Sequence, residues 1–135
     1  MNCLTGLRPP AGRGWVDALG QNGNMIHQLR IYEIFEHNKA AFHARFRDHA
    51  WRIMGRYGFR VLGFWESPGP DRTEFVYLLE WDDEDTMRSA WREFLADAEW
   101  KEIKRVTAAQ HGELVGEITE RTLVPTPYTP WSKDL

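Results

Sequence analysis

Five side chains of this 135-residue sequence are of types that bind and orient small ligands. They are Arg30, Tyr32, His49, Trp65 and Tyr77. An arginine in aromatic surroundings needs an anion or other acceptors, because an isolated buried charge is very costly. We therefore predict that Arg30 holds a carboxylate or enolate-like anion, with the two tyrosines as hydroxyl donors and the tryptophan as a stacking wall. The competing hypothesis pairs Arg30 with Glu117, or with another acidic group of the last strand or of a partner subunit.

His49 is the histidine best placed for acid–base chemistry. Together with Phe42, Phe46 and Ile53 it follows the spacing of one helix face, so we expect His49 on the face that packs on the sheet. Imidazole titrates near neutral pH, which suits proton transfer if the ring reaches a cavity. The simpler interpretation is a core histidine with a hydrogen-bond partner, and a haem-linked role would need this ring as an axial ligand.

The motifs of several other site classes are absent, and we predict no metal site and no cofactor. His43 and His49 are six residues apart. A helix places that spacing on different faces, so the two rings cannot form the i, i+4 pair of a zinc-binding helix. The sequence contains no G-x-S-x-G nucleophile motif and no phosphate-binding glycine loop, and its single cysteine is Cys3.

Composition limits the partners and the compartment. Seventeen basic and twenty acidic residues give a net charge of −3, which offers no reason to expect nucleic acid or an anionic membrane as a partner. One cysteine favours a reducing compartment, so we expect a cytoplasmic protein. Residues 1–24 lack a periodic pattern and are predicted to be a disordered extension, with Met25 as an alternative natural start. The folded domain is predicted to span residues 25–131.

The periodic part of the sequence predicts alternating strands and helices. Strands are expected at 26–33, 59–66, 74–81 and 113–123. Helices are expected at 38–57, from the acidic run 82–85 to Leu95, and from Asp97 to Thr107, with Asn38 and Asp97 as N-caps and Gly58 as a left-handed C-terminal residue. The order βαββαβ predicts an α+β, ferredoxin-like fold, in which both helical segments cover one face of a four-stranded antiparallel sheet.

The period of two divides the strand side chains between two faces. The set predicted to lie under the helices is Leu29, Ile31, Leu62, Phe64, Val76 and Leu78. The set predicted to lie on the uncovered face is Ile26, Gln28, Arg30, Tyr32, Val61, Trp65, Phe75, Tyr77, Leu79 and Trp81. A monomer rarely exposes so much contiguous aromatic surface, so we expect a homodimer whose two sheets face each other.

Several segments resemble the NIPSNAP family of the dimeric α/β-barrel superfamily. They are MIHQLRIYE, RFRDHAWRIMGRYGFRVLGFWE, YLLEWDDEDTMRSAW, DAEWKEI and RTLVPTPYTPW, and together they span residues 25–131. The resemblance implies a homodimer whose sheets close into a barrel with a central cavity, and it brings no shared catalytic residues. Tyr77 stands where a family histidine is expected and Leu79 where an aromatic is common, so chemistry attributed to that histidine does not transfer to this chain.

Two functions follow from these observations. The first is a homodimeric small-ligand-binding or interaction protein of undefined biochemical activity, whose barrel cavity holds a small anionic or apolar ligand. The alternative is a cofactor-independent enzyme of the monooxygenase, isomerase or dehydratase type that the wider superfamily contains. In that case His49, Tyr32 or Tyr77 would be the acid–base groups.

Overall fold

A computed structural model describes residues 25–130 of the chain, and the predicted extension at 1–24 lies outside the described residues. The elements, in chain order, are β1 (Ile26–Ile34), α1 (Lys39–Arg45), a π-helical turn η3 (Phe46–Ala50), α2 (Trp51–Arg56), β2 (Arg60–Pro68), β3 (Thr73–Trp81), α3 (Glu84–Ala96), α4 (Ala98–His111) and β4 (Val115–Leu123). A short 3-10 turn at Glu36–Asn38 precedes α1. The predicted βαββαβ order is confirmed, with the second helical segment divided into α3 and α4.

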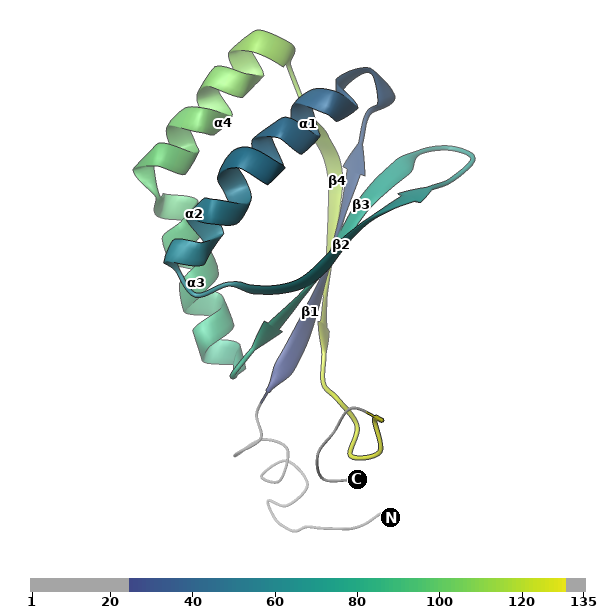
Figure 1. Cartoon of the computed structure of the whole chain (residues 1–135), viewed down its shortest axis with the longest axis vertical. Helices are drawn as coiled ribbons and strands as arrows, with labels where there is room; N and C mark the ends of the chain where they lie inside the picture. The colour runs from purple at the N-terminus through teal and green to yellow at the C-terminus, as the bar shows by residue number, and fades with distance from the viewer. Residues whose placement is uncertain (1–24, 131–135) are drawn as a thin grey trace.

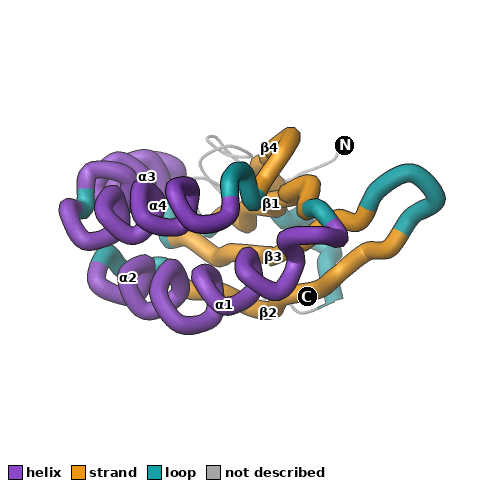
Figure 2. Tube along the Cα trace, turned by 90° about the horizontal axis from the view of Figure 1, so that it is seen from above, coloured by secondary structure: helices purple, strands orange, loops and turns teal. Residues whose placement is uncertain are grey.

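The four strands form one antiparallel sheet in the order β2-β3-β1-β4. Figures 1 and 2 show all the helices on one side of this sheet, as the sequence predicted. In the described part of the chain no helix is long and apolar enough to span a bilayer. Within residues 25–130 no helix covers the other side of the sheet, and the side chains that point from that side define what we call the bare face.

The predicted membership of the two faces is wrong for β1 and β3. The helix side buries Ile26, Tyr32, Phe75, Tyr77, Leu79 and Trp81, the set expected on the uncovered face. Leu29 and Ile31, expected under the helices, lie on the bare face with Val76 and Leu78. Alternation separates the two sets but does not say which one the helices cover when both are apolar. The larger aromatic side chains occupy the deeper space between the sheet and the helices.

A bulge in β2 explains why that strand follows the prediction only in part. The register shifts between Val61 and Gly63, so Phe64 pairs with Tyr77 and Trp65 with Val76. Phe64 therefore packs on the core and Trp65 lies on the bare face, both as predicted. Before the bulge the assignment is reversed. Val61 packs against the core, and Leu62 is 48% exposed.

The π-helical turn changes which side chains of the first helix face the sheet. Phe42 and Phe46 are buried, and Ala50 rather than His49 follows them on that face. A π turn holds one more residue than an α turn, so every position after it is displaced by one. His49 is consequently only partly buried, and its predicted place among the core side chains is wrong.

Caps and glycines define the ends of the helices. The Asp97 carboxylate accepts a hydrogen bond from the Trp100 backbone N–H at 2.8 Å, and Gly58 has a φ of 81°, both as predicted. Asn38 makes no side-chain cap. Its amide donates instead to the carbonyls of His111 and Glu113, at 3.0 and 2.8 Å. Asn38 therefore ties the start of α1 to the connection between α4 and β4.

Candidate functional site

An aromatic groove of about 340 Å³ lies between the first helical segment and the edge strand β2. Its lining side chains are His43, Phe46, Arg47, Trp51, Phe64, Trp65, Glu66 and Phe75. The Phe64 ring meets Trp51 edge-to-face at 5.0 Å and Phe46 at 5.5 Å, measured between centroids. Trp51 and Trp65 remain 50% and 53% exposed, so the groove has large apolar walls that nothing in the described chain covers.

A histidine and a carboxylate stand together in this groove. His43 Nε2 lies 2.5 Å from Glu66 Oε2, and Lys39 Nζ lies 3.4 Å from the other oxygen of Glu66. The hydrogen bond from His43, together with Lys39, lowers the pKa of Glu66 below its usual value. A carboxylate that holds one nitrogen of an imidazole ring leaves the other nitrogen to exchange a proton with a bound molecule.

This pair was not predicted from the sequence, because its two members are 23 residues apart and belong to different elements. Glu66 pairs with Phe75 across the sheet and so points to the helix side, where α1 presents His43. The available signal was alternation along β2, since Glu66 lies two residues after Phe64, which the sequence placed under the helices.

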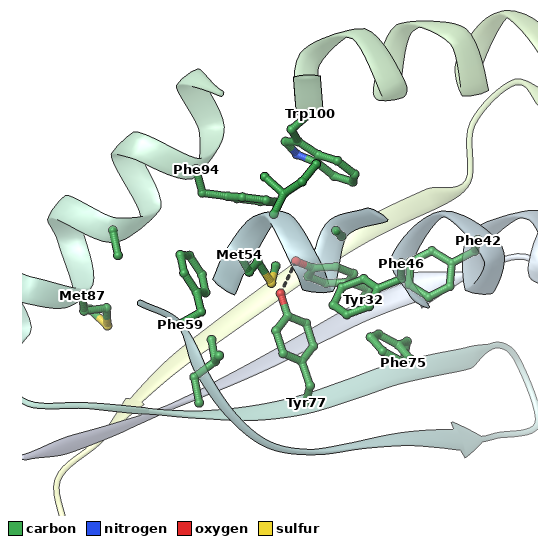
Figure 3. Close-up of a cluster of buried hydrophobic side chains, with 14 of the residues drawn as sticks. Tyr32, Phe42, Phe46, Met54, Phe59, Phe75, Tyr77, Met87, Phe94 and Trp100 are labelled. Atoms are coloured by element: carbon green, nitrogen blue, oxygen red, sulfur yellow. Dashed lines mark hydrogen bonds between the residues drawn. The ribbon is translucent and has the colours of Figure 1, made fainter. Parts of the chain in front are cut away.

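A second cluster joins Arg30, Tyr32 and Tyr77 on the helix side of the sheet. Arg30 Nη2 donates to the Tyr32 hydroxyl at 3.2 Å. The Tyr32 and Tyr77 hydroxyls are 2.6 Å apart, and the dashed line in Figure 3 marks this hydrogen bond. The predicted proximity of these three residues is therefore observed. Tyr77 is fully buried, and this burial raises its pKa well above the ordinary value. Neither of the two grooves described here is lined by any of the three.

Trp91 of α3 covers Arg30 and is held in place by a glutamine. The Arg30 guanidinium carbon lies 4.1 Å from the Trp91 ring centroid. Gln28 accepts hydrogen bonds from the indole N–H groups of Trp81 and Trp91, at 3.0 and 2.8 Å. This role of Gln28 was not predicted, since nothing in the strand pattern shows that two indole N–H groups donate to its amide oxygen.

The structure does not support the ion pair considered for Arg30. Glu117 instead accepts a hydrogen bond from Arg72 at 2.8 Å. Within residues 25–130 no carboxylate lies within ion-pair distance of Arg30, and its Nε is buried without a hydrogen-bond partner. This guanidinium is stabilised by a phenol and two aromatic faces rather than by a negative charge.

The remaining two predicted residues lie apart from that cluster. Trp65 lies on the opposite face of the sheet from Tyr77, so the prediction that the two share one face is wrong. His49 lines another groove of about 330 Å³. One side of this groove is formed by α1 and η3, and the other side by α4. Its Nδ1 accepts a hydrogen bond from Arg52 at 3.1 Å. The five residues thus fall in three places, and His49 is not joined to the tyrosines as acid–base partners.

Among residues 25–130 no three histidine, cysteine or carboxylate side chains gather as a metal site would require. The fold and the grooves together define a class, the ferredoxin-like α+β proteins with one helix-covered and one bare sheet face. The NIPSNAP family model matches residues 27–130, and the chain belongs to the NIPSNAP family. The sequence resemblance to that family is thereby confirmed.

Solved structures of bacterial relatives share this fold. An uncharacterised NIPSNAP-like domain protein from Burkholderia xenovorans is 21% identical, with a TM-score of 0.67 over 79% of this chain and 90% of that one. Two NIPSNAP family proteins from Agrobacterium tumefaciens are each 16% identical. The first has a TM-score of 0.68 over 81% of this chain and 100% of its own. The second, of unknown function, has a TM-score of 0.66 over 79% and 93%. No curated protein sequence matches this chain.

Proposed function

We propose that this NIPSNAP-family protein is a homodimer that binds a small apolar, aromatic molecule in the groove at the β2 edge of each subunit. The observation that carries the proposal is the groove itself, about 340 Å³ in volume and walled by five aromatic rings. Pockets for small molecules are concave and mostly apolar, with a few polar groups that orient the ligand. Trp51 and Trp65 supply the walls, and His43 with Glu66 supplies the polar end.

The proposal moves the ligand from the position that the sequence suggested. A cavity between the two sheets would be lined by the bare face, whose central side chains, Leu29, Ile31, Val76 and Leu78, are aliphatic and partly buried. Side chains of this kind favour a dry contact between sheets. The rings of Tyr32, Phe75, Tyr77 and Trp81 are on the helix side, so ligand binding is proposed within each subunit.

The bare face supports the proposed homodimer. Its aliphatic centre has charged groups at both ends of the strands. At one end Arg72 donates to Glu74 and Glu117, and at the other His27 lies 3.7 Å from Glu80. An apolar patch with a charged rim is typical of interfaces between subunits. Because Trp65 belongs to both the bare face and the groove, the partner subunit would also close one wall of the ligand site.

The ligand proposal is tested with indole as a flat, uncharged probe in isothermal titration calorimetry. The variants Trp51→Ala and Trp65→Ala each remove one tryptophan wall of the groove. Each should weaken indole binding about tenfold, because stacking and apolar contact are lost. Tyr128→Ala is the matched control, because Tyr128 is an aromatic residue of the C-terminal arm that is 74% exposed and lies outside the groove. Equal indole affinities for the wild type and both tryptophan variants would disprove the site.

A second candidate function is proton transfer on such a ligand, favoured by the 2.5 Å contact between His43 and Glu66. In this reaction the imidazole removes an acidic C–H proton and the carboxylate stabilises the resulting imidazolium. Isomerases and dehydratases both use such a step. The test follows deuterium exchange into phenylacetone by proton NMR in heavy water. His43→Gln should slow any enzymatic exchange about 100-fold, and exchange that equals the buffer rate in the wild type rejects this function.

A further inference from the structure

The Trp65 indole covers a residue of β2 that has no side chain. A Cβ atom on Gly63 would lie 2.7 Å from Trp65 Cη2 and 3.1 Å from Trp65 Cζ2, closer than packed carbon atoms come to each other. Gly63 has no positive φ, so its backbone does not itself require a glycine. The close approach of the ring is therefore the reason for a glycine here, and any side chain at position 63 would push the indole away.

This placement makes the indole part of the bare face. Gly63 pairs with Leu78 and Trp65 pairs with Val76, so the ring lies beside the two aliphatic side chains that β3 places at the centre of that face. Trp65 is 53% exposed. A half-exposed aromatic ring next to aliphatic surface is the kind of group that contacts between subunits bury. The apolar centre of the proposed dimer contact therefore extends to the β2 edge.

The same indole is also a wall of the aromatic groove. Trp65 lines this groove together with Phe64 and with Trp51. A side chain that is half exposed keeps rotational freedom, and fixing it costs conformational entropy. Contact with the partner subunit or contact with a ligand, whichever comes first, fixes the ring at that cost. The second event then meets a ring that is already fixed, so the first event favours it.

We propose that homodimer formation and ligand binding in the aromatic groove are coupled through Trp65, and that Gly63 is the positioning residue on which this coupling depends. The inference rests on the proposed function, and it adds that each subunit binds its ligand more tightly in the dimer than alone. Coupling between two binding events is reciprocal. If the dimer binds indole about tenfold more tightly than the monomer, indole must stabilise the dimer by the same factor at each of its two sites.

The first test compares indole affinity in the dimer and in a monomeric variant. Leu29→Arg should give a monomer, because it places a charge at the centre of the bare face. Leu29 belongs to β1, two strands away from Trp65, and it does not line the groove. Isothermal titration calorimetry should show indole binding about tenfold weaker in Leu29→Arg than in the wild-type dimer. Leu95→Arg is the matched control, since Leu95 is exposed on α3, and it should bind indole as the wild type does.

The reciprocal measurement uses the wild type alone. Sedimentation at increasing dilution gives the dissociation constant of the dimer, first without indole and then with saturating indole. Saturation of both sites should lower this constant about 100-fold, which is tenfold for each site.

The second test moves the ring without removing it. Gly63→Ala should reduce the coupling factor from about tenfold to near one, because the added Cβ displaces the indole from the bare face. Gly55→Ala is the matched control and should leave the coupling unchanged, since a Cβ on Gly55 of α2 meets no other part of the structure within 4 Å. In a Trp65→Ala background, Gly63→Ala should not change the dissociation constant of the dimer any further, because no ring is left to displace.

The outcomes separate this inference from the proposed function. Equal indole affinities in the wild-type dimer and in Leu29→Arg, with a dimer dissociation constant that indole does not change, would overturn the coupling and leave the dimer and the ligand site intact. A wild type that stays monomeric or does not bind indole would overturn the proposed function, and the coupling with it. Unchanged coupling in Gly63→Ala would overturn the role of Gly63. Trp65→Ala tests the coupling if Gly63→Ala does not fold, since its coupling factor should also be near one.

Discussion

On its helix side the sheet carries Gln28, Arg30 and Tyr77, whereas the alternate positions of the same strands place Leu29 and Val76 on the bare face. The helix side is a network in which hydroxyls, an amide and a guanidinium each have a particular partner. The bare face has no such network at its centre. Directional contacts fix side-chain positions, while aliphatic surface only needs to be covered. We therefore assign association to the bare face, and ligand binding to the aromatic groove beside the first helical segment.

The largest effect is expected from a charge at the centre of the bare face. Leu78→Arg should convert the proposed homodimer to a monomer, because an unpaired guanidinium would be buried between two sheets. Light scattering should then fall from about twice the chain mass of 15.8 kDa to the single-chain mass.

Leu95→Arg is the matched control for this change, since Leu95 is a leucine 49% exposed on α3, on the helix side of the molecule. That variant should keep the mass of the wild type. A wild-type protein that scatters as a monomer would remove the distinction between an associating face and a binding face.

A smaller effect is expected from the buried hydroxyl pair on the helix side. Tyr77→Phe removes the partner that lies 2.6 Å from the Tyr32 hydroxyl, while Arg30 still donates to that hydroxyl. The free energy of unfolding should therefore fall by about 1 kcal/mol, the usual net contribution of one hydrogen bond. Urea unfolding measures this change.

Tyr128→Phe, at a tyrosine that is 74% exposed, should leave the free energy of unfolding unchanged. A loss for Tyr77→Phe no larger than for Tyr128→Phe would show that the polar network is not what distinguishes the helix side.

The smallest effect concerns acid stability at the rim of the aromatic groove. The pKa of Glu66 is lowered in the folded protein by His43 and Lys39, so this carboxylate stabilises the fold above its unfolded pKa of about 4.5. The contribution is lost as the pH falls through the lowered folded value. Glu66→Gln should therefore flatten the decrease of the melting temperature below about pH 4.5. Lys39→Met should flatten the dependence of the melting temperature on pH less than Glu66→Gln does. If the wild type and Glu66→Gln give the same dependence, the contact of Glu66 with His43 is absent in solution.

Much of the fold was predictable because it depends on local patterns. The element boundaries follow hydrophobic periods and turn residues such as Gly58, whose positive φ ends the first helical segment. The closeness of Arg30, Tyr32 and Tyr77 was also predictable, because alternation places Arg30 and Tyr32 on one face and antiparallel register sets Tyr77 opposite Arg30.

Other features required contacts between distant segments. The faces on which Val61 and Leu62 lie depend on the bulge in β2, and the exposure of His49 depends on a π turn after Arg45. Each is a one-residue irregularity that displaces every following side chain, and neither has a pattern that distinguishes it from regular structure.

The sequence alone determined the order of the elements, the two sets of alternating side chains, and a single polar cluster on β1 and β3. Only the tertiary structure decided which set lies beneath the helices. Both sets are apolar enough to be buried, so hydrophobicity does not choose between them. Side-chain volume does, because the space between the sheet and the helices is filled by Phe75, Tyr77 and Trp81, and the smaller Leu29, Val76 and Leu78 remain on the bare face.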